Sequence, residues 1–266
     1  MNIHHIGFIG TGRIARALIT GLAGKENVKL YGFDTSPAAL ETITRDYPVE
    51  ASLSIGELAE KTEIIVLSVK PFHMASVLEQ LKPHLRGKHL LASVAAGISS
   101  EFVREHTGET VRVIRVMPNT PAFVGEGMTA LCRGRAATGN DLEVAEELFQ
   151  AIGRTVVLDE PLMDSATALS GSGPAYLFHI VAALAEAGVR CGLSKEDALL
   201  MSAQTMYGAA KMVLTGGRSP EELISEVTTP GGTTEAGMKV LYERDIRTIL
   251  FDTIEAAAAR SRELMQ

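Results

Sequence analysis

Two glycine- and hydroxyl-rich segments in the second half of the chain have the composition of an anion-binding site. Residues 228–234 read Thr-Thr-Pro-Gly-Gly-Thr-Thr, and residues 169–176 read Leu-Ser-Gly-Ser-Gly-Pro-Ala-Tyr. Glycines let backbone N–H groups turn toward one point, and the flanking hydroxyls add donors that can rotate. Such segments suit a core poorly, so we interpret both as loops that bind a negatively charged small molecule.

A helix is predicted directly after residues 228–234. Ala236 and Val240 have helical spacing, which places Thr233 or Thr234 at the helix N-cap. A helix N-terminus favours a carboxylate or a phosphate. A plain Thr-capped turn is the alternative. The candidate substrate-binding residues in the two segments are Ser172, Gly231, Gly232, Thr233 and Thr234.

The start of the chain has the pattern of a dinucleotide-binding turn. Residues 5–9 read as a short buried strand, the pattern Gly-x-Gly-x-x-Ala follows, and an apolar-periodic helix runs on to about residue 22. Gly10 allows the tight turn, Gly12 lets a pyrophosphate approach the backbone, and Ala15 lets the helix pack closely on the strand. A plain βα turn is the alternative. The residues expected to bind the cofactor here are Ile9, Gly10, Thr11, Gly12, Arg13 and Ile14.

Asp34, at the end of the next predicted strand, bears on the choice of cofactor. It stands about 20 residues after the glycine pattern, where an acid accepts hydrogen bonds from a ribose 2′-hydroxyl and repels a 2′-phosphate. This favours NADH over NADPH. In the alternative interpretation Thr35 and Ser36, with a nearby Arg or Lys, accept the phosphate, while Asp34 faces solvent or caps the helix that starts at Pro37.

The first 159 residues alternate strand-like and helix-like segments. Runs rich in β-branched residues occur between helical patterns, at residues 63–69, 89–95, 110–117 and 154–158. Such alternation predicts an α/β Rossmann-type, doubly wound domain with a parallel sheet and helices on both faces. Ligands bind beyond the carboxyl ends of such strands, and ordinary turns are the alternative. The further cofactor contacts expected there are Val69, Lys70, Pro71, Ala95, Ala96 and Asn119.

After residue 159 the strand pattern ends. Helices are predicted at residues 163–169, 174–189, 195–214, 220–227, 235–243 and 246–265. Apolar residues such as Ile180 and Met206 lie on more than one face of these helices, and such a helix needs a partner on every side. We therefore predict two domains: residues 1–159 bind the dinucleotide, and residues 160–266 form an all-α domain for substrate binding and dimerisation.

Composition excludes several other classes of protein. The net charge of −7 and the lack of a basic cluster argue against a nucleic-acid partner. Glycine or charge interrupts the apolar stretches short of a membrane span, and no signal peptide is visible, so we expect a soluble, cytoplasmic protein. Cys132 and Cys191 have no metal-type spacing; we expect no metal and two structural thiols.

Several motifs stand in the order found in pyrroline-5-carboxylate reductases, and the chain resembles that family over essentially its whole length. Besides the two anion-binding segments, they are Ile-Gly-Phe-Ile-Gly-Thr-Gly at 6–12, Val-Lys-Pro at 69–71, Ala-Ala-Gly at 95–97 and Met-Pro-Asn-Thr-Pro-Ala at 117–122. The two anion-binding segments are specific to that family, whereas the others recur more widely among nucleotide-binding folds.

The resemblance implies the last step of proline biosynthesis, in which NAD(P)H reduces 1-pyrroline-5-carboxylate to L-proline. It also implies a Rossmann domain, a helical domain that interlocks with its twofold mate in a homodimer, and, as in many members, a ring of dimers. The chain departs from the family pattern at two positions. Ile55 stands where members often have an Asn that contacts the adenosine end, and Asp34 replaces the Ser or Arg type usual in NADP users. Both departures weigh against an NADP preference.

The implied reaction needs little acid–base chemistry from the protein. Hydride adds to a C=N bond most easily when the nitrogen is protonated, and the substrate can bring that proton as an iminium, so positioning and electrostatics supply most of the acceleration. We expect Thr234 to hydrogen-bond the ring nitrogen beside Ser172, and His179 to be a packed or surface residue. The alternatives are another imine reductase, a non-catalytic NAD-binding regulator, or a β-hydroxyacid dehydrogenase, which would need a Lys near Tyr176 and Leu177.

Overall fold

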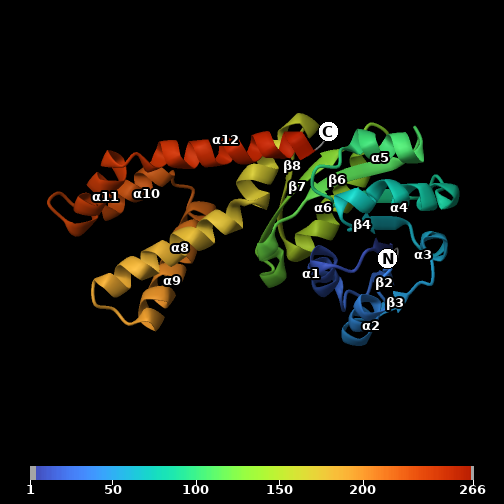
Figure 1. Cartoon of the computed structure of the whole chain (residues 1–266), viewed down its shortest axis with the longest axis horizontal. Helices are drawn as coiled ribbons and strands as arrows, with labels where there is room; N and C mark the ends of the chain where they lie inside the picture. Colours follow the sequence, from blue (N-terminus) through green and yellow to red (C-terminus); the bar gives the residue numbers. More distant parts are fainter. Residues whose placement is uncertain (1–3, 265–266) are drawn as a thin grey trace. The chain divides into compact units, whose positions relative to one another are not determined.

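The computed structural model describes residues 4–264, which form two compact units (Figure 1). Unit 1 contains the described residues up to Ser172 together with those from Ala256 onward, and unit 2 contains Gly173–Glu255. The end of the last helix therefore belongs to unit 1. A functional boundary at residue 160 remains a prediction.

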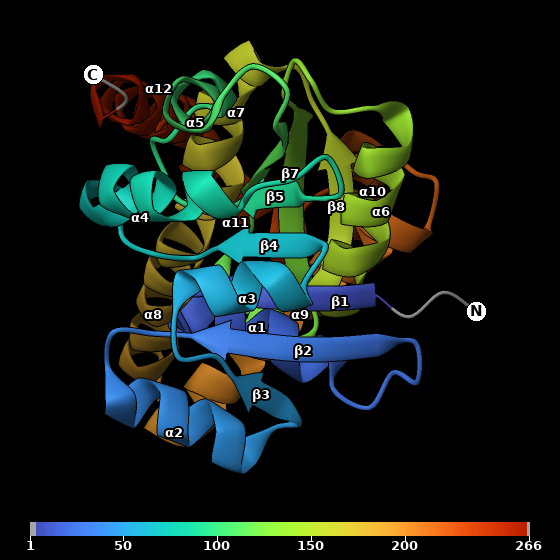
Figure 2. The ribbon, with the colours of Figure 1, turned by 90° about the vertical axis from the view of Figure 1, so that its right-hand side faces the viewer.

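Unit 1 is built on one eight-stranded sheet with the order β3-β2-β1-β4-β5-β6-β7-β8 (Figure 2). Strands β1 to β6 pair in parallel, while β7 runs antiparallel to β6 and parallel to β8. The order of the first six is that of the dinucleotide-binding fold, so the predicted fold class is confirmed. The strands are β1 His4–Ile9, β2 Val28–Phe33, β3 Val49–Ala51, β4 Ile64–Leu67, β5 Leu90–Ser93, β6 Arg112–Met117, β7 Gly127–Arg133 and β8 Gly153–Val157.

Helices cover both faces of this sheet. Phe8 and Ile9 are neighbours on β1 and point to opposite faces, so each joins a different core. The core around Phe8 includes Leu18 of α1 and Phe149 of α6, whereas the core around Ile9 joins α3, α4 and α5. The helices are α1 Arg13–Leu22, α2 Pro37–Asp46, α3 Ile55–Lys61, α4 Met74–Leu81, α5 Ser100–Thr107, α6 Gly139–Phe149 and the short α7 Met163–Ala166.

Strands β3 and β7 do not appear among the strands predicted from the sequence. β3 has only three residues, too few to show a period. Between β6 and β7 the chain forms one short 3-10 turn, Thr120–Val124. A parallel crossover needs a dozen or more residues, so β7 pairs antiparallel to β6, and the all-parallel sheet expected from the alternation is wrong at this edge.

Unit 2 contains helices near the positions predicted for them. They are α8 Gly173–Arg190, α9 Lys195–Thr215, α10 Pro220–Val227, α11 Thr233–Glu243 and most of α12 Ile246–Leu264. Ser219 and Glu222 form a reciprocal capping box at the start of α10, with Pro220 in its first turn. Local capping signals thus set the start of this helix.

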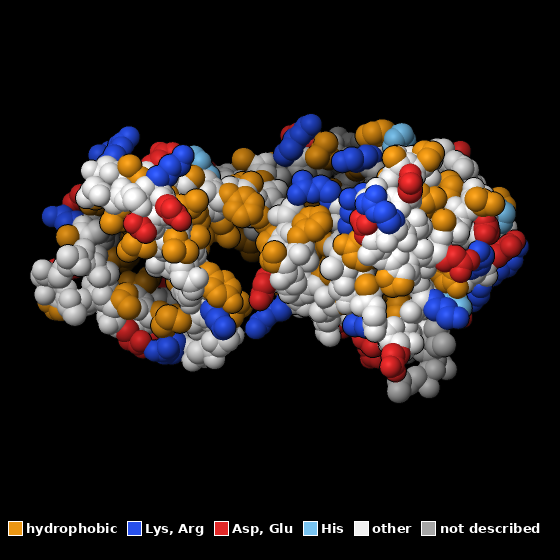
Figure 3. All heavy atoms as spheres, turned by 90° about the horizontal axis from the view of Figure 1, so that it is seen from below, with side chains coloured by type: hydrophobic (Ala, Val, Ile, Leu, Met, Phe, Trp, Pro, Cys, Tyr) orange, Lys and Arg blue, Asp and Glu red, His pale blue; other side chains and the backbone are white. Residues whose placement is uncertain are grey.

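Large apolar side chains lie on the surface of unit 2, as Figure 3 shows for one face. Leu177, Phe178, Leu184, Leu199, Leu200 and Met201 of α8 and α9 are each at least 50% exposed. The same two helices line an apolar groove with Leu184, Leu193, Met201, Met206 and Val213. A contiguous apolar surface of this kind marks an interaction site.

One helical stretch among residues 4–264, at 160–190, is long and apolar enough to cross a membrane by length and composition. Its 18-residue window has a mean hydropathy of 1.3 and is 17% buried. Glycine does interrupt the apolar residues of this stretch, at Gly171 and Gly173, and one helix of this kind is weak evidence for a membrane span. The helix continues through Gly171 and Gly173, because residues Thr167–Gly171 form a turn of π-helix that leads into α8.

A buried polar network holds the end of α12 against the sheet of unit 1. Arg115 on β6 is 4% exposed, and its guanidinium lies 3.5 Å from Glu160 and 3.9 Å from Asp164. Glu160 accepts hydrogen bonds from the backbone N–H and the hydroxyl of Ser100. Asp164 accepts one from the Ser261 hydroxyl at 2.7 Å. The network therefore joins α5, β6, α7 and α12.

Cys132 lies beside this network, opposite Arg115 in the β6–β7 pairing. Burial, reinforced by the Glu160 carboxylate, raises the pKa of Cys132 to about 11. The thiol therefore stays protonated at neutral pH. Cys191 in unit 2 is exposed, and both cysteines are free.

His89, just before β5, is a buried histidine with both ring nitrogens engaged. Its Nδ1 accepts a hydrogen bond from the Arg86 N–H at 2.8 Å, so the neutral ring donates from Nε2 to the Ala59 carbonyl at 2.9 Å. The side chain is 2% exposed, and burial lowers the pKa of His89 below its ordinary value of 6.5. The fold thus selects the neutral ring.

We predict that this histidine makes the stability depend on pH. Because the folded-state pKa is depressed, its contribution is present above about pH 6.5 and is lost as the pH falls, by at most about 1.4 kcal/mol per pH unit. The His89→Gln variant cannot titrate, so its free energy of unfolding should fall less between pH 7.5 and pH 5.5 than that of the wild type. Denaturant unfolding at both pH values measures the difference. An equally steep fall in the variant would assign the dependence to other groups.

Candidate functional site

The glycine-rich turn connects β1 to α1 at the carboxyl edge of the sheet. Gly10 has φ +90°, and a Cβ on it would lie 2.7 Å from the Ser68 carbonyl oxygen, so this position requires glycine. Gly12 is the N-cap of α1, and nothing lies within 4 Å of the position of a Cβ on it. No side chain caps α1, so its first-turn N–H groups are available to an anion. This arrangement fits a pyrophosphate.

Ser68 ties the turns after β1 and β4 together. Its hydroxyl donates to the Gly10 carbonyl at 2.5 Å, and its backbone N–H donates to the Ile9 carbonyl at 2.9 Å. β1 lies between β2 and β4, where the strand order reverses and such folds bind ligands. Ser68 directly precedes the predicted cofactor residue Val69, but its contact with Gly10 depends on the strand order, which the sequence alone does not give.

Asp34 follows β2 and bonds to the glycine-rich turn itself. Its Oδ2 accepts hydrogen bonds from the Thr11 backbone N–H at 2.7 Å and from the Thr11 hydroxyl at 3.0 Å. Its Oδ1 accepts one from the Ser36 N–H at 2.8 Å. Ser36, rather than Asp34, caps α2, by accepting from Ala39 N–H. Asp34 therefore brings a negative charge to the turn and also holds the turn in shape.

The remaining predicted cofactor residues follow neighbouring strands of the same sheet. Val69 and Lys70 come directly after Ser68 at the end of β4, Pro71 begins the next turn, Ala95 and Ala96 come after β5, and Asn119 comes after β6. Because β1 to β6 are parallel, these residues share the sheet edge with Gly10 and Gly12. The structure places them together as predicted, while their contacts to a cofactor remain predictions.

Asn119 uses its side-chain amide within unit 1. Its Oδ1 accepts from the Met128 N–H at 2.8 Å, and its Nδ2 donates to the Ser170 carbonyl and hydroxyl at 3.2 and 3.3 Å. Beside it, a Cβ on Gly171 would lie 2.5 Å from the Met117 Cε. Asn119 therefore joins the loop after β6 to the segment around Ser170.

Residues 170–173 were predicted as a loop between the helices at 163–169 and 174–189, but the helical conformation continues through Gly171 and resumes at Gly173, so the predicted loop was wrong. Residues Thr167–Gly171 form the π-helical turn, Ser172 N–H donates to the Thr167 carbonyl at 2.8 Å, and α8 begins at Gly173. α8 is thus the continuation of a helical segment and lacks the open N-terminus that we expected. π-Helical turns occur frequently at functional sites. The hydroxyl of Ser172 remains the predicted substrate contact.

The second glycine segment forms the turn before α11 in unit 2. Gly232 is the N-cap and Thr233 the first helical residue, so the predicted Thr cap was wrong. Gly231 has φ +72°, which favours glycine. Its N–H donates to the Glu235 carboxylate at 2.8 Å, and the Gly232 N–H donates to the Thr229 carbonyl at 2.9 Å.

This turn opens onto a groove of about 720 Å³ lined by α10 and α11. Gly231, Gly232 and Glu235 line it, along with Ser225 and Tyr242. Two of the predicted N–H donors already have partners inside the chain. The first-turn N–H groups of Thr233 and Thr234 and their hydroxyls are therefore the donors that the turn offers to a ligand. The sequence alone did not indicate Glu235, although its place two residues after Thr233 suits a helix-start acceptor.

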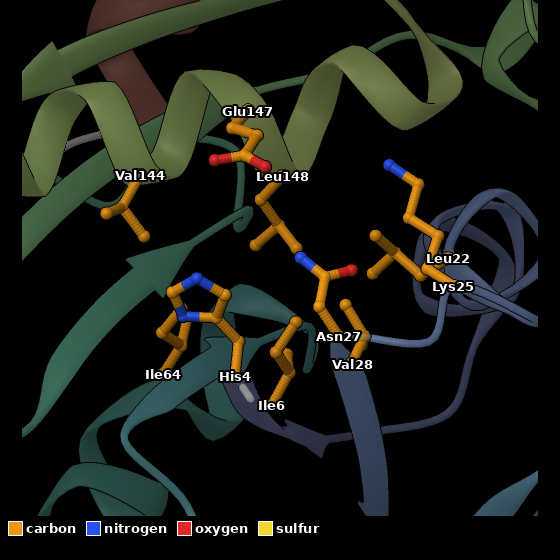
Figure 4. A pocket seen from close by; sticks show the side chains of 10 residues that line it. All are labelled: His4, Ile6, Leu22, Lys25, Asn27, Val28, Ile64, Val144, Glu147 and Leu148. Atoms are coloured by element: carbon orange, nitrogen blue, oxygen red, sulfur yellow. The ribbon is translucent and has the colours of Figure 1, made fainter. Parts of the chain in front are cut away.

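A cation–π contact lies near the carboxyl edge of the sheet, and a small cavity lies at the opposite edge. The Arg13 guanidinium lies 5.4 Å from the centre of the Phe123 ring, a cation–π contact between the glycine-rich turn and the loop after β6. A small cavity of about 30 Å³ lies at the amino ends of the strands, between His4, Ile64 and Leu148 (Figure 4). That cavity is at the wrong edge for a ligand of this fold.

Residues 4–264 contain no group of three or more His, Cys, Asp or Glu side chains placed to hold a metal ion. His179 lies on α8 and is exposed. The polar groups at the two glycine-rich turns are backbone N–H groups, hydroxyls and isolated charged side chains. They suit the binding and orientation of anionic molecules.

Comparison with protein families identifies two segments of the chain. Residues 160–264 match the family described as pyrroline-5-carboxylate reductase dimerisation, and residues 5–97 match the family described as NADP oxidoreductase, coenzyme F420-dependent. Both segments contain the glycine-rich motifs described above.

Relatives match over the whole chain. A pyrroline-5-carboxylate reductase of Arabidopsis thaliana is 39% identical over 98% of this chain and 95% of its own, and one of Methanosarcina acetivorans is 37% identical over 99% of each. The structure of a pyrroline-5-carboxylate reductase from Coxiella burnetii superposes with a TM-score of 0.94 at 34% identity, covering 100% of both chains. A Plasmodium falciparum pyrroline carboxylate reductase, crystallised with NADP bound, gives a TM-score of 0.85 at 31% identity, also over 100% of both chains.

Proposed function

The chain belongs to the pyrroline-5-carboxylate reductase family, and from this we propose that it reduces 1-pyrroline-5-carboxylate to L-proline by hydride transfer from NAD(P)H. The observation that carries the proposal is the whole-chain match, because it includes both the dinucleotide-binding turn and the helical segment with the Pro-Gly-Gly-Thr-Thr turn. The direct test is oxidation of NADH and NADPH with pyrroline-5-carboxylate as substrate. Absence of turnover with both cofactors would contradict it.

The cofactor is an NAD(P)H whose pyrophosphate is bound by the N–H groups at the start of α1. Gly10 and Gly12 support this role, since one permits the turn and the other leaves the backbone open. The bound nicotinamide supplies the hydride. The residues proposed to line the rest of the site are Ile9, Thr11, Arg13, Ile14, Val69, Lys70, Pro71, Ala95, Ala96 and Asn119.

NADH is the proposed preferred cofactor. The Asp34 carboxylate lies at the end of β2, bonded to Thr11, where a fold of this type places the adenosine ribose. A 2′-phosphate there would meet a fixed negative charge. The Plasmodium falciparum relative was crystallised with NADP bound, and Asp34 is the proposed discriminator in this chain.

The substrate carboxylate is proposed to bind at the start of α11. The N–H groups of Thr233 and Thr234 are available there, and the Gly231–Gly232 backbone shapes the turn. We further propose that the Ser172 hydroxyl binds the carboxylate and that the Thr234 hydroxyl donates a hydrogen bond to the lone pair that forms on the ring nitrogen in the transition state. Hydride then adds to the carbon of the C=N bond, while the nitrogen keeps the proton it carried as an iminium.

Residues 160–266 are proposed as a dimerisation domain. The family description of residues 160–264 and the apolar groove on α8 and α9 support it. A second copy is the partner that would cover Leu184 and Met201, which one chain leaves half exposed. A ring of dimers and a cytoplasmic location complete the proposal; the two free thiols agree with a reducing compartment.

If Asp34 selects the cofactor, the wild type should have the higher kcat/KM with NADH. Asp34→Asn removes the charge but leaves one oxygen to accept from Thr11. The ratio of kcat/KM with NADH to kcat/KM with NADPH should therefore fall by about tenfold, as expected for a carboxylate near a phosphate in water. Asp34→Ser should narrow the gap too, with some loss of activity from a looser turn. Asp46→Asn, at the exposed end of α2, is the charge control. Equal use of NADPH by the wild type would exclude this role.

If Thr234 donates to the ring nitrogen, Thr234→Ala should lower kcat as well as kcat/KM. One neutral hydrogen bond contributes about 0.5–1.5 kcal/mol, so the loss should be roughly 2- to 13-fold. Ser172→Ala should instead raise KM with kcat nearly preserved, because it removes a contact that is made equally in the ground state and in the transition state. Steady-state kinetics at saturating cofactor separates the two. An unchanged kcat in Thr234→Ala would exclude a hydrogen bond from Thr234 in the transition state. The ring nitrogen would then depend only on the proton that the substrate brings.

If a second copy covers the groove of α8 and α9, Leu184→Glu should convert the dimer to a monomer at micromolar concentration, because it places a charge in an apolar interface. Val124→Glu in unit 1 is the matched control, since Val124 is 76% exposed and undergoes the same change of type. Light scattering measures both masses. A dimeric Leu184→Glu protein would place the interface elsewhere.

A further inference from the structure

Glu235 contacts the turn that is proposed to bind the substrate carboxylate. Its Oε2 accepts a hydrogen bond from the Gly231 N–H at 2.8 Å, across four residues. Glu235 is the third residue of α11 and the acidic residue of its first turn. The carboxylate therefore lies at the helix N-terminus, the position where a helix favours negative charge.

The contact has two separate physical effects. The hydrogen bond holds the Gly231 backbone at φ +72°, although a glycine can adopt many other conformations. The negative charge of Glu235, in contrast, would repel an incoming carboxylate and offset part of the attraction between that carboxylate and the helix N-terminus. Glu235 is exposed and lines the same groove as Gly231 and Gly232. A bound anion and Glu235 would thus share one helix N-terminus.

We propose that Glu235 is a positioning residue that holds the Pro-Gly-Gly-Thr-Thr turn in its binding conformation while its charge weakens the binding of carboxylate ligands. The inference rests on the proposed function of this turn. Its consequence is a site that is shaped before the substrate arrives but releases a carboxylate product readily. No proton moves between Glu235 and the ligand in this role.

Two substitutions separate the hydrogen bond from the charge. Glu235→Gln keeps an oxygen that can accept from the Gly231 N–H and removes the charge. Glu235→Ala removes both. Glu221→Gln is the matched control, because Glu221 lines the same groove at the start of α10 and the substitution changes the net charge equally.

The probe is cyclopentanecarboxylate, a five-membered ring with a carboxylate and no ring nitrogen, so that only the anion is tested. Its inhibition constant against pyrroline-5-carboxylate should fall by roughly 3- to 10-fold in Glu235→Gln, the range for two unit charges about 6 Å apart at effective dielectric constants between roughly 80 and 40, since Glu235 is exposed. The gain should shrink from 20 mM to 500 mM salt, because salt screens the repulsion. Glu235→Ala should bind the probe more weakly than Glu235→Gln, because it also loses the hydrogen bond that holds the Gly231 backbone.

Different results contradict the two levels of inference. A wild type that does not turn over pyrroline-5-carboxylate contradicts the proposed function. An active wild type with an unchanged or higher inhibition constant in Glu235→Gln contradicts the role of the charge alone, as does an equal gain in Glu221→Gln. Direct binding of the probe by calorimetry keeps the comparison possible if a variant loses activity.

Discussion

The close contact between the turn after β1 and the end of β4 is the constraint on which unit 1 depends. Gly10 lies so near the Ser68 carbonyl that a Cβ has no room, and the Ser68 hydroxyl closes the contact from the other side. After this tight turn α1 begins at Arg13, and no side chain caps its first turn. The turns after β2, β4, β5 and β6 then surround that helix N-terminus, because parallel strands end at one edge.

In each of the two glycine-rich turns a carboxylate accepts hydrogen bonds from the turn, but the backbone donors that remain for a ligand differ. At α1 the nearby acid, Asp34, bonds to Thr11 and leaves the N–H groups of the first helical turn free. At α11 the acid, Glu235, bonds to the turn itself and takes one donor. Each carboxylate orders a flexible glycine backbone, which reduces the conformational entropy lost when a ligand binds. In our proposals, Asp34 discriminates between the two cofactors and Glu235 weakens the binding of carboxylates.

The two units differ in how they bury apolar surface. Unit 1 has cores on both faces of its sheet and a buried polar network around Arg115 that holds the end of α12. Unit 2 has few buried side chains, and α8 and α9 keep large apolar residues on their surface. A helical unit of this kind gains stability from the surface of a partner, so its folding and its association are linked.

The sequence by itself was sufficient for six of the eight strands, the dinucleotide-binding turn, the family and the start of α10, because each depends on residues close together in the chain. Tertiary structure decided the rest. The direction of β7 follows from a short connection, residues Thr167–Gly171 form a π-helical turn, and Gly232 rather than a threonine is the N-cap of α11. Which acid meets which turn depends on strand order and helix phase, so only the folded chain shows that Asp34 bonds to Thr11 and Glu235 to Gly231.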